Sequence, residues 1–437
     1  MSDIVKKEAE IILVDNNDLY EFSRDLIINS RKIVYQAANF ACRVKGVIAI
    51  FSVAKEREAF PLLKTCSYLD HATTGLIPAY SLDAMHDYLS MRAGGIGMAG
   101  YWDLWRRADE IREPLGKMFG CEGREIVYGL SSTQLFNIFA NGIGLKNGDN
   151  VVTPETTYPA NAFIWLNKAS EGIELRYVDK LANDGRMTPD ELFELVDERT
   201  RVVSINLVDS RTGFRQDVAE IGRRCRQRGI YMIVDATQAA NALFIDVKAL
   251  NADFVTTSGY KWFLGPLGHG FAYIDKDLLP KLSQSYVGWV GTVDRSRLDA
   301  RRMDLCDDAR RFESGNINFA ALFGMEKVVE RYLSIGGEAI EDHIMSLVDH
   351  VYKRASELSR FKIYGNYLRE NRSGIVVFEI PEGIAITDEQ MSAHGVRAWV
   401  RRGAILRTGF HYMNTMSDVD CLIDMLKKFE KQSGNAQ

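Results

Sequence analysis

Two ionisable residues stand at the ends of apolar, strand-like stretches, and their types suit one kind of chemistry. Asp235 lies in Tyr231–Ala236, and Lys261 follows the next such stretch, in the tight loop after Ser258. A lysine amine forms a Schiff base with an aldehyde, and a carboxylate keeps a pyridine nitrogen protonated so that the ring accepts electrons. A lone loop lysine is usually only solvated, but an aspartate and a lysine in this order are what a pyridoxal 5'-phosphate (PLP) site needs.

Hydroxyl and aromatic side chains follow other strand-like stretches and complete the expected site. Ser132 and Thr133 open a helical stretch, where hydroxyls and free backbone N–H groups form a cradle for phosphate. Ser258 and Tyr260 flank the lysine with two more hydroxyls, and Tyr158 offers an aromatic face that stacks on a ring. Taken alone, Ser132 or Thr133 would be a helix cap and Tyr158 a half-buried loop tyrosine. Together with the aspartate and the lysine they predict one cofactor site.

The elements that must position these residues alternate between short apolar runs and helical stretches. Continuous apolar strands separated by helices indicate a mostly parallel sheet covered on both faces, and hence an α/β fold. Ligands of such sheets bind beyond the carboxyl ends of the strands, where Asp235, Ser258 and Lys261 fall. The expected strands are Ile126–Gly129, Val151–Thr153, Leu175–Val178, Val202–Val208, Met232–Val234, Phe254–Thr256 and Phe271–Ile274.

Beyond Phe319 the pattern changes to two long helical segments, then short strand-like runs and a final helix, which indicates a smaller α+β domain. We therefore expect a partly helical N-terminal extension over residues 1–55, a large PLP-binding domain over 56–325 and a small C-terminal domain over 326–437. The expected helices of the extension and of the small domain are 18–29, 31–43, 320–335, 338–358 and one from about 417, and the expected strands are 374–380, 397–400 and 405–408.

Composition excludes several classes of protein. The 437 residues carry 54 basic and 59 acidic side chains, a net charge of −5, which gives no support for a nucleic-acid partner. No apolar run reaches membrane-spanning length, and the first residues do not resemble a secretory signal. Six scattered cysteines without a C-x-x-C pair argue against a zinc site or a disulfide framework. We expect a cytoplasmic protein with no metal, no membrane partner and a small-molecule substrate.

The stretch G-I-G-M-A-G at residues 95–100 fits the dinucleotide fingerprint G-x-G-x-x-G. It follows a helical stretch, Ser81–Arg92, and no βαβ unit surrounds it, although the fingerprint requires a preceding strand and such a unit. A nicotinamide dehydrogenase is therefore not expected, and we predict a mobile glycine loop near a ligand instead.

Several stretches, in this order and spacing, resemble the class V aminotransferase family of fold-type I PLP enzymes. They read Y-L-D-H-A-T-T-G-L-I-P, R-E-I-V-Y-G-L-S-S-T-Q, V-D-A-T-Q-A, T-S-G-Y-K-W, R-F-E-S-G-N-I-N and L-R-T-G-F-H-Y-M-N-T. The family includes cysteine desulfurases, isopenicillin N epimerase-like proteins and kynureninase relatives, and the likeness runs from about residue 60 to about residue 426. It implies a seven-stranded, mostly parallel sheet in the large domain, a smaller α+β C-terminal domain and PLP as the cofactor.

The resemblance also implies a role for each matching residue. Lys261 would carry the cofactor and move the proton at the substrate Cα, Asp235 would pair with the pyridinium, and Gln238 would lie near the ring hydroxyl or the Schiff base. Tyr158 falls where relatives stack a histidine or another ring. Arg407 stands where relatives bind the substrate carboxylate. A planar guanidinium suits a bidentate contact with a carboxylate, so we favour this role over that of an ordinary surface arginine. The residues implied to bind the phosphate are Ser132, Thr133, Ser258 and Tyr260, together with Asn316, which would reach the neighbouring subunit's site in a homodimer.

Two departures from the family pattern bear on the reaction. Cysteine desulfurases need a nucleophilic cysteine shortly before the carboxylate-binding arginine, but Met391–Leu406 contains none, and Cys421 falls within the expected final helix. Ser210 stands where desulfurases usually place an asparagine over the cofactor, and we count it as a cofactor residue. The adjacent Arg211 would suit a substrate with an additional acidic group.

The missing cysteine resembles the lyase and epimerase members more than the desulfurases. Because elimination needs the least machinery beyond removal of the Cα proton, we predict a β-eliminating C–S lyase acting on an amino acid or an amino-acid conjugate. An aminotransferase or an epimerase of the same family stays open as an alternative. A PLP-fold protein that has lost catalysis and serves as an interaction module also stays open, although Lys261, Asp235 and Arg407 are all present.

Overall fold

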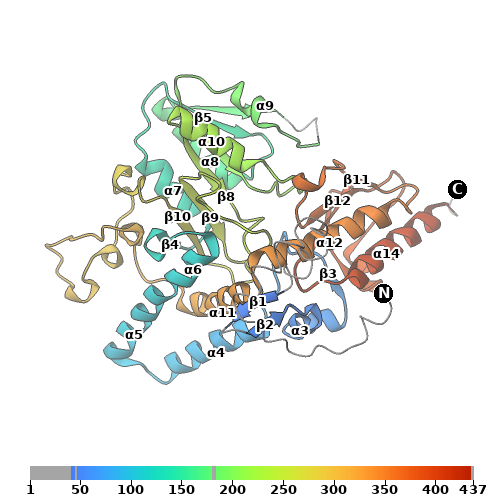
Figure 1. Ribbon diagram of the computed structural model, residues 1–437, viewed down its shortest axis with the longest axis horizontal. Coiled ribbons are helices and arrows are strands. Elements are labelled where there is room, and N and C mark those ends of the chain that lie inside the picture. Colours follow the sequence, from blue (N-terminus) through green and yellow to red (C-terminus); the bar gives the residue numbers. More distant parts are fainter. Residues whose placement is uncertain (1–40, 45–46, 180–183, 435–437) are drawn as a thin grey trace, which may run out of the picture. The chain divides into compact units, whose positions relative to one another are not determined.

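The computed structural model describes residues 41–44, 47–179 and 184–434, and the chain divides into two compact units at Phe51 (Figure 1). In the first unit, β1 (Ala41–Val44) and β2 (Val47–Ile50) form an antiparallel hairpin. The helix predicted at 18–29 lies outside the described residues. The helix predicted at 31–43 is wrong at residues 41–43, which belong to β1, because the Val- and Ile-rich β2 pairs with them and such residues favour strands.

A seven-stranded mixed sheet forms the centre of the second unit and confirms the predicted α/β fold class. β10 pairs antiparallel with β4 and β9, and all other neighbours in the sheet are parallel. In spatial order the strands are β4 (Ile126–Gly129), β10 (Gly270–Ile274), β9 (Phe254–Ser258), β8 (Tyr231–Asp235), β7 (Thr200–Asn206), β5 (Asn150–Pro154) and β6 (Glu174–Val178).

Helices between the strands cover this sheet, because its central strands are apolar on both faces and are almost completely buried. Two of these helices begin where a side chain accepts a backbone N–H: Thr188 caps α9 through the N–H of Glu191, and Asp217 caps α10 through the N–H of Glu220. The covering helices are α6 (Arg112–Phe119), α7 (Ser132–Gly142), α8 (Pro159–Asn167), α9 (Pro189–Phe193) and α10 (Val218–Arg228).

Three longer helices, α4 (Ala79–Ala93), α5 (Gly97–Glu110) and α11 (Phe319–Ile335), lie beside the sheet, with α4 packed along α11 (Figure 1). The expectation of a glycine loop at 95–100 is wrong from Gly97 onward, because these residues form the first turn of α5. Gly95 and Gly97 line a hollow together with Trp102 and Trp289, apart from the predicted cofactor residues.

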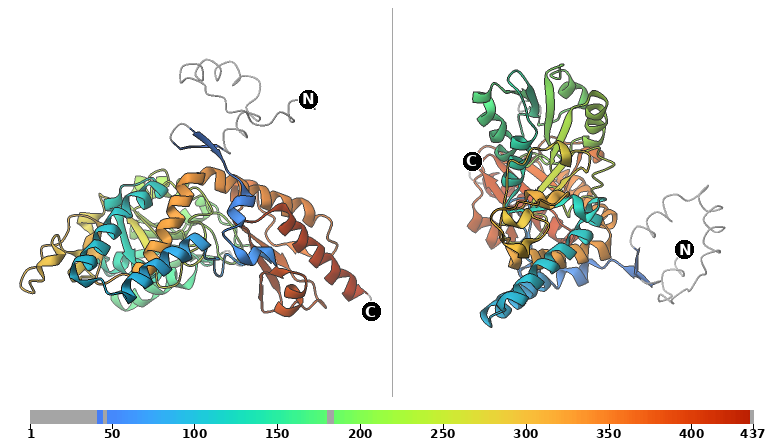
Figure 2. Two further views of the ribbon diagram at one scale, coloured as in Figure 1. Left: turned by 90° about the horizontal axis from the view of Figure 1, so that it is seen from below. Right: turned by 90° about the vertical axis from the view of Figure 1, so that its left-hand side faces the viewer.

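The smaller domain has a four-stranded antiparallel sheet whose core is closed by two helices. Apolar residues of α12 and α14 pack against β12 and β15 in one buried cluster, and the left-hand view in Figure 2 shows the two helices, in orange and red, next to each other. α11 runs across the expected boundary between residues 325 and 326. The elements are β11 (Lys362–Ile363), β12 (Ile375–Glu379), β15 (Ile405–Gly409) and β14 (Trp399–Arg401), with α12 (Gly337–Ala355), α13 (Asp388–Ala393) and α14 (Met416–Gly434).

The start of the second unit pairs with strands of the smaller domain. β3 (Ser67–Tyr68) pairs in parallel with β13 (Val396–Arg397), and Asp70 forms a further bridge to Gly409 of β15. The helix α3 (Val53–Arg57) precedes them, and Arg57 pairs with Asp418 of α14 at 2.8 Å. None of the helices that the structure describes has the length and apolar character needed to cross a membrane.

Candidate active site

A pocket opens at the carboxyl ends of the parallel strands, where ligands of such sheets bind. Every residue predicted to contact the cofactor within one chain lines this pocket, so the structure brings together side chains that are up to 129 residues apart in the numbering from Ser132 to Lys261. Thirteen residues line it: Ser131, Ser132, Thr133, Tyr158, Asn206, Val208, Ser210, Asp235, Thr237, Gln238, Ser258, Tyr260 and Lys261.

Asp235 lies at the end of β8 and Lys261 in the loop after the adjacent β9. Both side chains line the pocket and are buried, at 6% and 7% exposure. Burial lowers the pKa of Lys261 to about 8, against the opposing effect of Asp235. Burial likewise raises the pKa of Asp235, although its carboxylate accepts the Thr237 N–H at 2.9 Å. A lysine amine that loses its proton near neutral pH suits both attack on an aldehyde and proton transfer at carbon.

The loop that carries Lys261 is fixed by a close backbone approach from the T-T-G stretch. The N–H of Gly75 donates to the carbonyl of Tyr260 at 2.9 Å. A Cβ on Gly75 would lie 2.0 Å from the carbonyl oxygen of Lys261, so only glycine fits at this position. This contact explains why the early Y-L-D-H-A-T-T-G stretch belongs to the site although it is distant in sequence.

Two tyrosine rings border the lysine amine. Its Nζ lies 5.1 Å from the ring centre of Tyr158 and 5.6 Å from that of Tyr260. Tyr158 is 47% exposed, immediately before α8, so one ring face is open to the pocket. An exposed aromatic face beside a buried lysine is a platform on which a planar heterocycle can stack.

The start of α7 supplies a cluster of hydroxyls. Ser131, rather than Ser132 or Thr133, is the N-cap, and its side chain accepts from the Gln134 N–H. The Ser132 N–H donates to Ser258 Oγ at 3.1 Å, and Ser258 Oγ donates to Ser132 Oγ at 3.1 Å. Hydroxyls gathered at a helix N-terminus, where the helix dipole is positive, suit a phosphate group.

Asn206 is a pocket residue that sequence reasoning missed, and it tests whether the pocket fits PLP. It ends β7 opposite Asp235 of β8, is 4% exposed, and neither of its amide atoms has a hydrogen-bond partner within the described residues. A buried amide without a partner costs about 1–3 kcal/mol, so the pocket needs a polar ligand that satisfies it. A ring that carries a hydroxyl and a protonated nitrogen meets this need, and the residues present therefore fit PLP. The signal in the sequence was a polar residue within the apolar run 202–208.

Arg407 of β15 reaches the pocket through Ser210. Its Nη1 donates to the Ser210 carbonyl at 2.7 Å, and its Nη2 donates to Thr73 Oγ1 at 2.6 Å and lies 3.7 Å from Asp70. Burial lowers the pKa of Arg407 and raises that of Asp70. The guanidinium lies over the ring of Trp399 at 4.5 Å, and its Nε has no partner within the described residues. The side chain is therefore a buried cation with an unused donor.

Two predicted residues lie elsewhere in the chain. Arg211 lines a neighbouring hollow with Glu155, Phe163 and Tyr177, because the turn after Ser210 points it away from the pocket. Asn316 accepts a hydrogen bond from the Tyr101 hydroxyl and does not line the pocket of its own chain. Its contact with a neighbouring subunit's cofactor stays a prediction.

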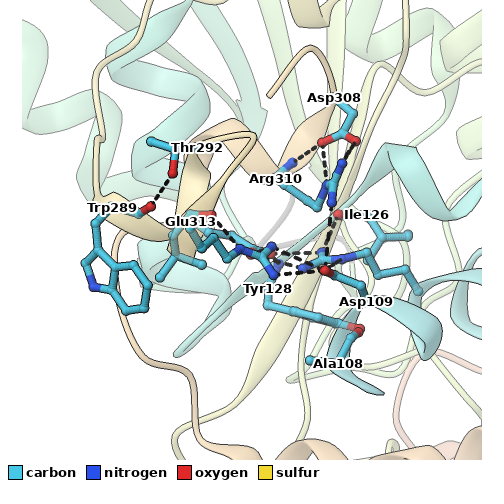
Figure 3. A network of polar contacts seen from close by, with 12 residues as sticks. Ala108, Asp109, Ile126, Tyr128, Trp289, Thr292, Asp308, Arg310 and Glu313 are labelled. Carbon is cyan, nitrogen blue, oxygen red and sulfur yellow. Dashed lines mark hydrogen bonds and ion pairs between the residues drawn. The ribbon is translucent and has the colours of Figure 1, made fainter. Parts of the chain in front are cut away.

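The segment before Asn316 is anchored by a buried ion-pair network (Figure 3). Glu313 accepts from Arg112 Nη2 at 3.0 Å and from the Tyr128 N–H at 3.0 Å, and both charged side chains are buried. Arg295 joins through Asp109 at 2.9 Å. The network fixes the end of the 3-10 turn η8 (Ala309–Phe312) against α6 and β4.

A tight hairpin precedes Arg407. β14 and β15 pair antiparallel, and Arg402 and Gly403 in the turn between them have positive φ angles of 49° and 68°. The connection contains no cysteine. Cys421 lies in α14, where its thiol contacts the His394 carbonyl at 3.4 Å. Within the described residues, no group of three or more His, Cys, Asp or Glu side chains is arranged to hold a metal ion.

Comparisons with known proteins show the family to which the chain belongs. The sequence profile of the family described as aminotransferase class-V matches residues 67–422. A probable cysteine desulfurase of Methanothermobacter thermautotrophicus is 29% identical over 392 residues, which cover 85% of this chain and 96% of that protein. A cysteine desulfurase of Serratia proteamaculans is 27% identical over 413 residues, which cover 88% of this chain and 100% of that protein.

Among solved structures, the apo cysteine desulfurase of Thermococcus onnurineus superimposes with a TM-score of 0.78 at 23% identity, and the match covers 88% of this chain and 99% of that one. At this identity the likeness establishes the fold. The chain belongs to the class V aminotransferase family. It is a PLP-dependent enzyme of that family, and the interaction-module alternative is set aside.

Proposed function

We propose that this enzyme is a PLP-dependent C–S lyase that removes sulfur from a cysteine-type amino acid by β-elimination. The observation that carries the proposal is the pairing of the Lys261–Asp235 pocket with a short, cysteine-free hairpin before Arg407. The relatives named as cysteine desulfurases support a cysteine C–S bond as the target. The hairpin favours release of the sulfur over its transfer to a cysteine of this chain.

The residues of the pocket would divide the work as follows. PLP, when bound, supplies a ring that accepts the electron pair left at the substrate Cα. Asp235 holds positive charge at the ring nitrogen, Tyr158 covers a ring face, and Gln238 and Ser210 hold the ring edge. Arg407 binds the substrate carboxylate and so orients the Cα–H bond. The phosphate is held by Ser132, Thr133, Ser258 and Tyr260.

Lys261 moves the proton in the elimination. Its neutral amine takes the Cα proton, the Cβ–S bond breaks with its electron pair going to sulfur, and a Cα=Cβ double bond forms. The amine returns the proton to the departing thiolate. The resulting enamine leaves the site and reacts with water to give a 2-oxo acid and ammonia, so that cysteine yields pyruvate, ammonia and sulfide.

The test is a product analysis of the PLP-loaded enzyme with L-cysteine, L-cystine and cysteine S-conjugates. We expect pyruvate and ammonia in equal amounts, together with sulfide, a persulfide or the conjugate's thiol. Lys261→Ala should abolish product formation, whereas Lys248→Ala, a substitution of a lysine outside the pocket, should leave it intact.

Other products would overturn the proposal and identify the alternative. Alanine with a protein-bound persulfide indicates desulfuration onto a cysteine of the chain. Pyridoxamine phosphate indicates an aminotransferase. Solvent deuterium at the Cα of recovered substrate, with inversion and without pyruvate, indicates an epimerase.

We also propose that the enzyme is a homodimer. Apolar side chains of the segment 287–303 are exposed around a hollow, among them Val293 at 72%, Leu298 at 67% and Met303 at 59%. Exposed apolar surface of this kind marks an interaction site. Light scattering after size exclusion should give twice the monomer mass of 49.3 kDa; a monomer that retains full activity would contradict the shared-site role of Asn316.

A further inference from the structure

Trp262, the residue after Lys261, is completely buried. Its indole Nε1 donates to Oε1 of Gln238 at 2.7 Å, and Nε2 of Gln238 donates to the Ala72 carbonyl at 3.1 Å. Gln238 itself lines the pocket and is 6% exposed. The indole is thus in direct contact with a pocket residue but does not reach the pocket itself.

These two contacts allow only one orientation of the Gln238 amide. An indole N–H only donates and a backbone carbonyl only accepts, so Oε1 must face Trp262 and Nε2 must face Ala72. A flipped amide would place two donors against each other and two acceptors against each other. The second hydrogen on Nε2 has no other use in these contacts and is left for the pocket.

We propose that Trp262 is a positioning residue that fixes Gln238 as a hydrogen-bond donor toward the cofactor. This inference rests on the proposed binding of PLP in the pocket but not on the reaction that follows. An N–H donor stabilises an anionic ring oxygen, and a hydrogen bond to the charged form lowers the pKa of the group that carries it. Without Trp262, the amide is free to present its oxygen instead, which disfavours the anion.

The indole ring is held rigidly by the small domain. A Cβ on Gly374 would lie 2.7 Å from the ring, and one on Gly409 would lie 3.4 Å from it, so the chain approaches the ring as bare backbone at both positions. The Trp262 carbonyl accepts from His411 Nε2 at 2.8 Å and from Asn241 Nδ2 at 3.0 Å. Because Gly409 is on β15, the strand of Arg407, the same side chain links the carboxylate-binding strand to the cofactor pocket.

The groups around Trp262 and Gln238 that titrate are few. His411 stacks on the indole and His71 lies 6.1 Å from it, and burial lowers the pKa of both, to about 4 for His411. Lys261 and Asp235 line the pocket with Gln238. The two histidines stay neutral through the neutral range, so a spectral change there does not arise from them.

The test is the visible absorption of bound PLP, titrated with pH in four proteins: wild type, Trp262→Phe, Gln238→Leu and the double variant. Trp262→Phe keeps an aromatic ring but loses the N–H. We expect each single substitution to raise the pH midpoint of the absorption change by about half a unit or more. The double variant should resemble Gln238→Leu, because Trp262 acts through Gln238.

Three outcomes would overturn the inference: an unchanged midpoint in Gln238→Leu, an unchanged midpoint in Trp262→Phe, or additive shifts in the double variant. Trp165→Phe is the matched control, since it removes another buried indole hydrogen bond, to Ser204 at 3.0 Å, away from the pocket. If Trp262→Phe does not fold, Gln238→Glu takes its place in the test. This substitution keeps an oxygen that accepts from the indole N–H and removes the N–H that would donate to the cofactor. A wild-type midpoint in that variant would also sink the idea. A protein that binds PLP with these shifts but gives no pyruvate would contradict the proposed reaction and not this inference.

Discussion

At the scale of single residues, the chemistry of the site depends on how far burial moves one amine. The pKa of Lys261 is lowered to about 8 chiefly by burial. The fraction of Lys261 in the neutral form, which attacks an aldehyde, therefore increases as the pH rises toward 8. We expect PLP uptake by the cofactor-free protein to quicken about tenfold per pH unit below that value and then to level off. Stopped-flow absorbance against pH measures this profile.

The matched variant for this profile is Asp235→Asn. The carboxylate of Asp235 opposes the lowering of the pKa of Lys261, so its removal should shift the midpoint to lower pH. A midpoint near the ordinary lysine value of about 10.4 in the wild-type protein would contradict the buried, partly neutral amine.

A second residue-scale prediction concerns Asn206. Because its buried amide has no partner within the described residues, Asn206→Leu should stabilise the cofactor-free protein by about 1 kcal/mol and weaken PLP binding at the same time. Thermal unfolding without PLP and a PLP titration give the two numbers. Asn150→Leu is the comparison, since Asn150 is buried but bonded to Asp197 and Thr200, and its loss should destabilise. Equal destabilisation by both substitutions would contradict a ligand-directed amide.

At the scale of elements, the Arg112–Glu313 pair joins α6 and β4 to the turn η8. Glu313→Ala leaves the buried Tyr128 N–H without its acceptor and removes the buried carboxylate that pairs with Arg112. We expect a loss of about 3–5 kcal/mol in the free energy of unfolding. Urea denaturation measures it. Glu110→Ala, which breaks the exposed pair with Arg106, should cost less than about 0.5 kcal/mol. If the two variants behave alike, the network is not what fixes the segment.

The positions of the strands in the sequence were the easiest feature to predict, and the order of the strands in the sheet was the hardest. Ile126–Gly129 was predicted at its observed bounds because it is a short apolar run between turns. No local pattern indicates that β10 inserts between β4 and β9, or that Gly75 packs on Lys261, since both contacts join segments distant in the chain. The alternation of strand-like and helical stretches was enough to predict the hydroxyls and the lysine of the pocket. It does not predict the contact between Trp262 and Gln238 or the turn that directs Arg211 away from the pocket.

At the scale of the whole molecule, all thirteen pocket residues lie in the unit 52–437. We expect a protein without residues 1–51 to fold and to take up PLP, as followed by its absorbance. Removing residues 1–58 also deletes Glu56 and Arg57, which pair with Arg331 and Asp418, and should cost about 2 kcal/mol or more of stability. Failure of the shorter truncation to bind PLP would assign the first unit a part in the site.

The hairpin between β14 and β15 has a consequence for the fate of the sulfur atom. A long loop with a cysteine of its own could bind the sulfur covalently, move it out of the pocket and transfer it to an acceptor. Three residues, Arg402 to Ala404, are too short a tether for such a delivery. Under the proposed reaction, the sulfur therefore leaves the pocket by diffusion at the end of each turnover. It enters the surrounding water as a small molecule that can react with any acceptor, and no particular protein receives it directly.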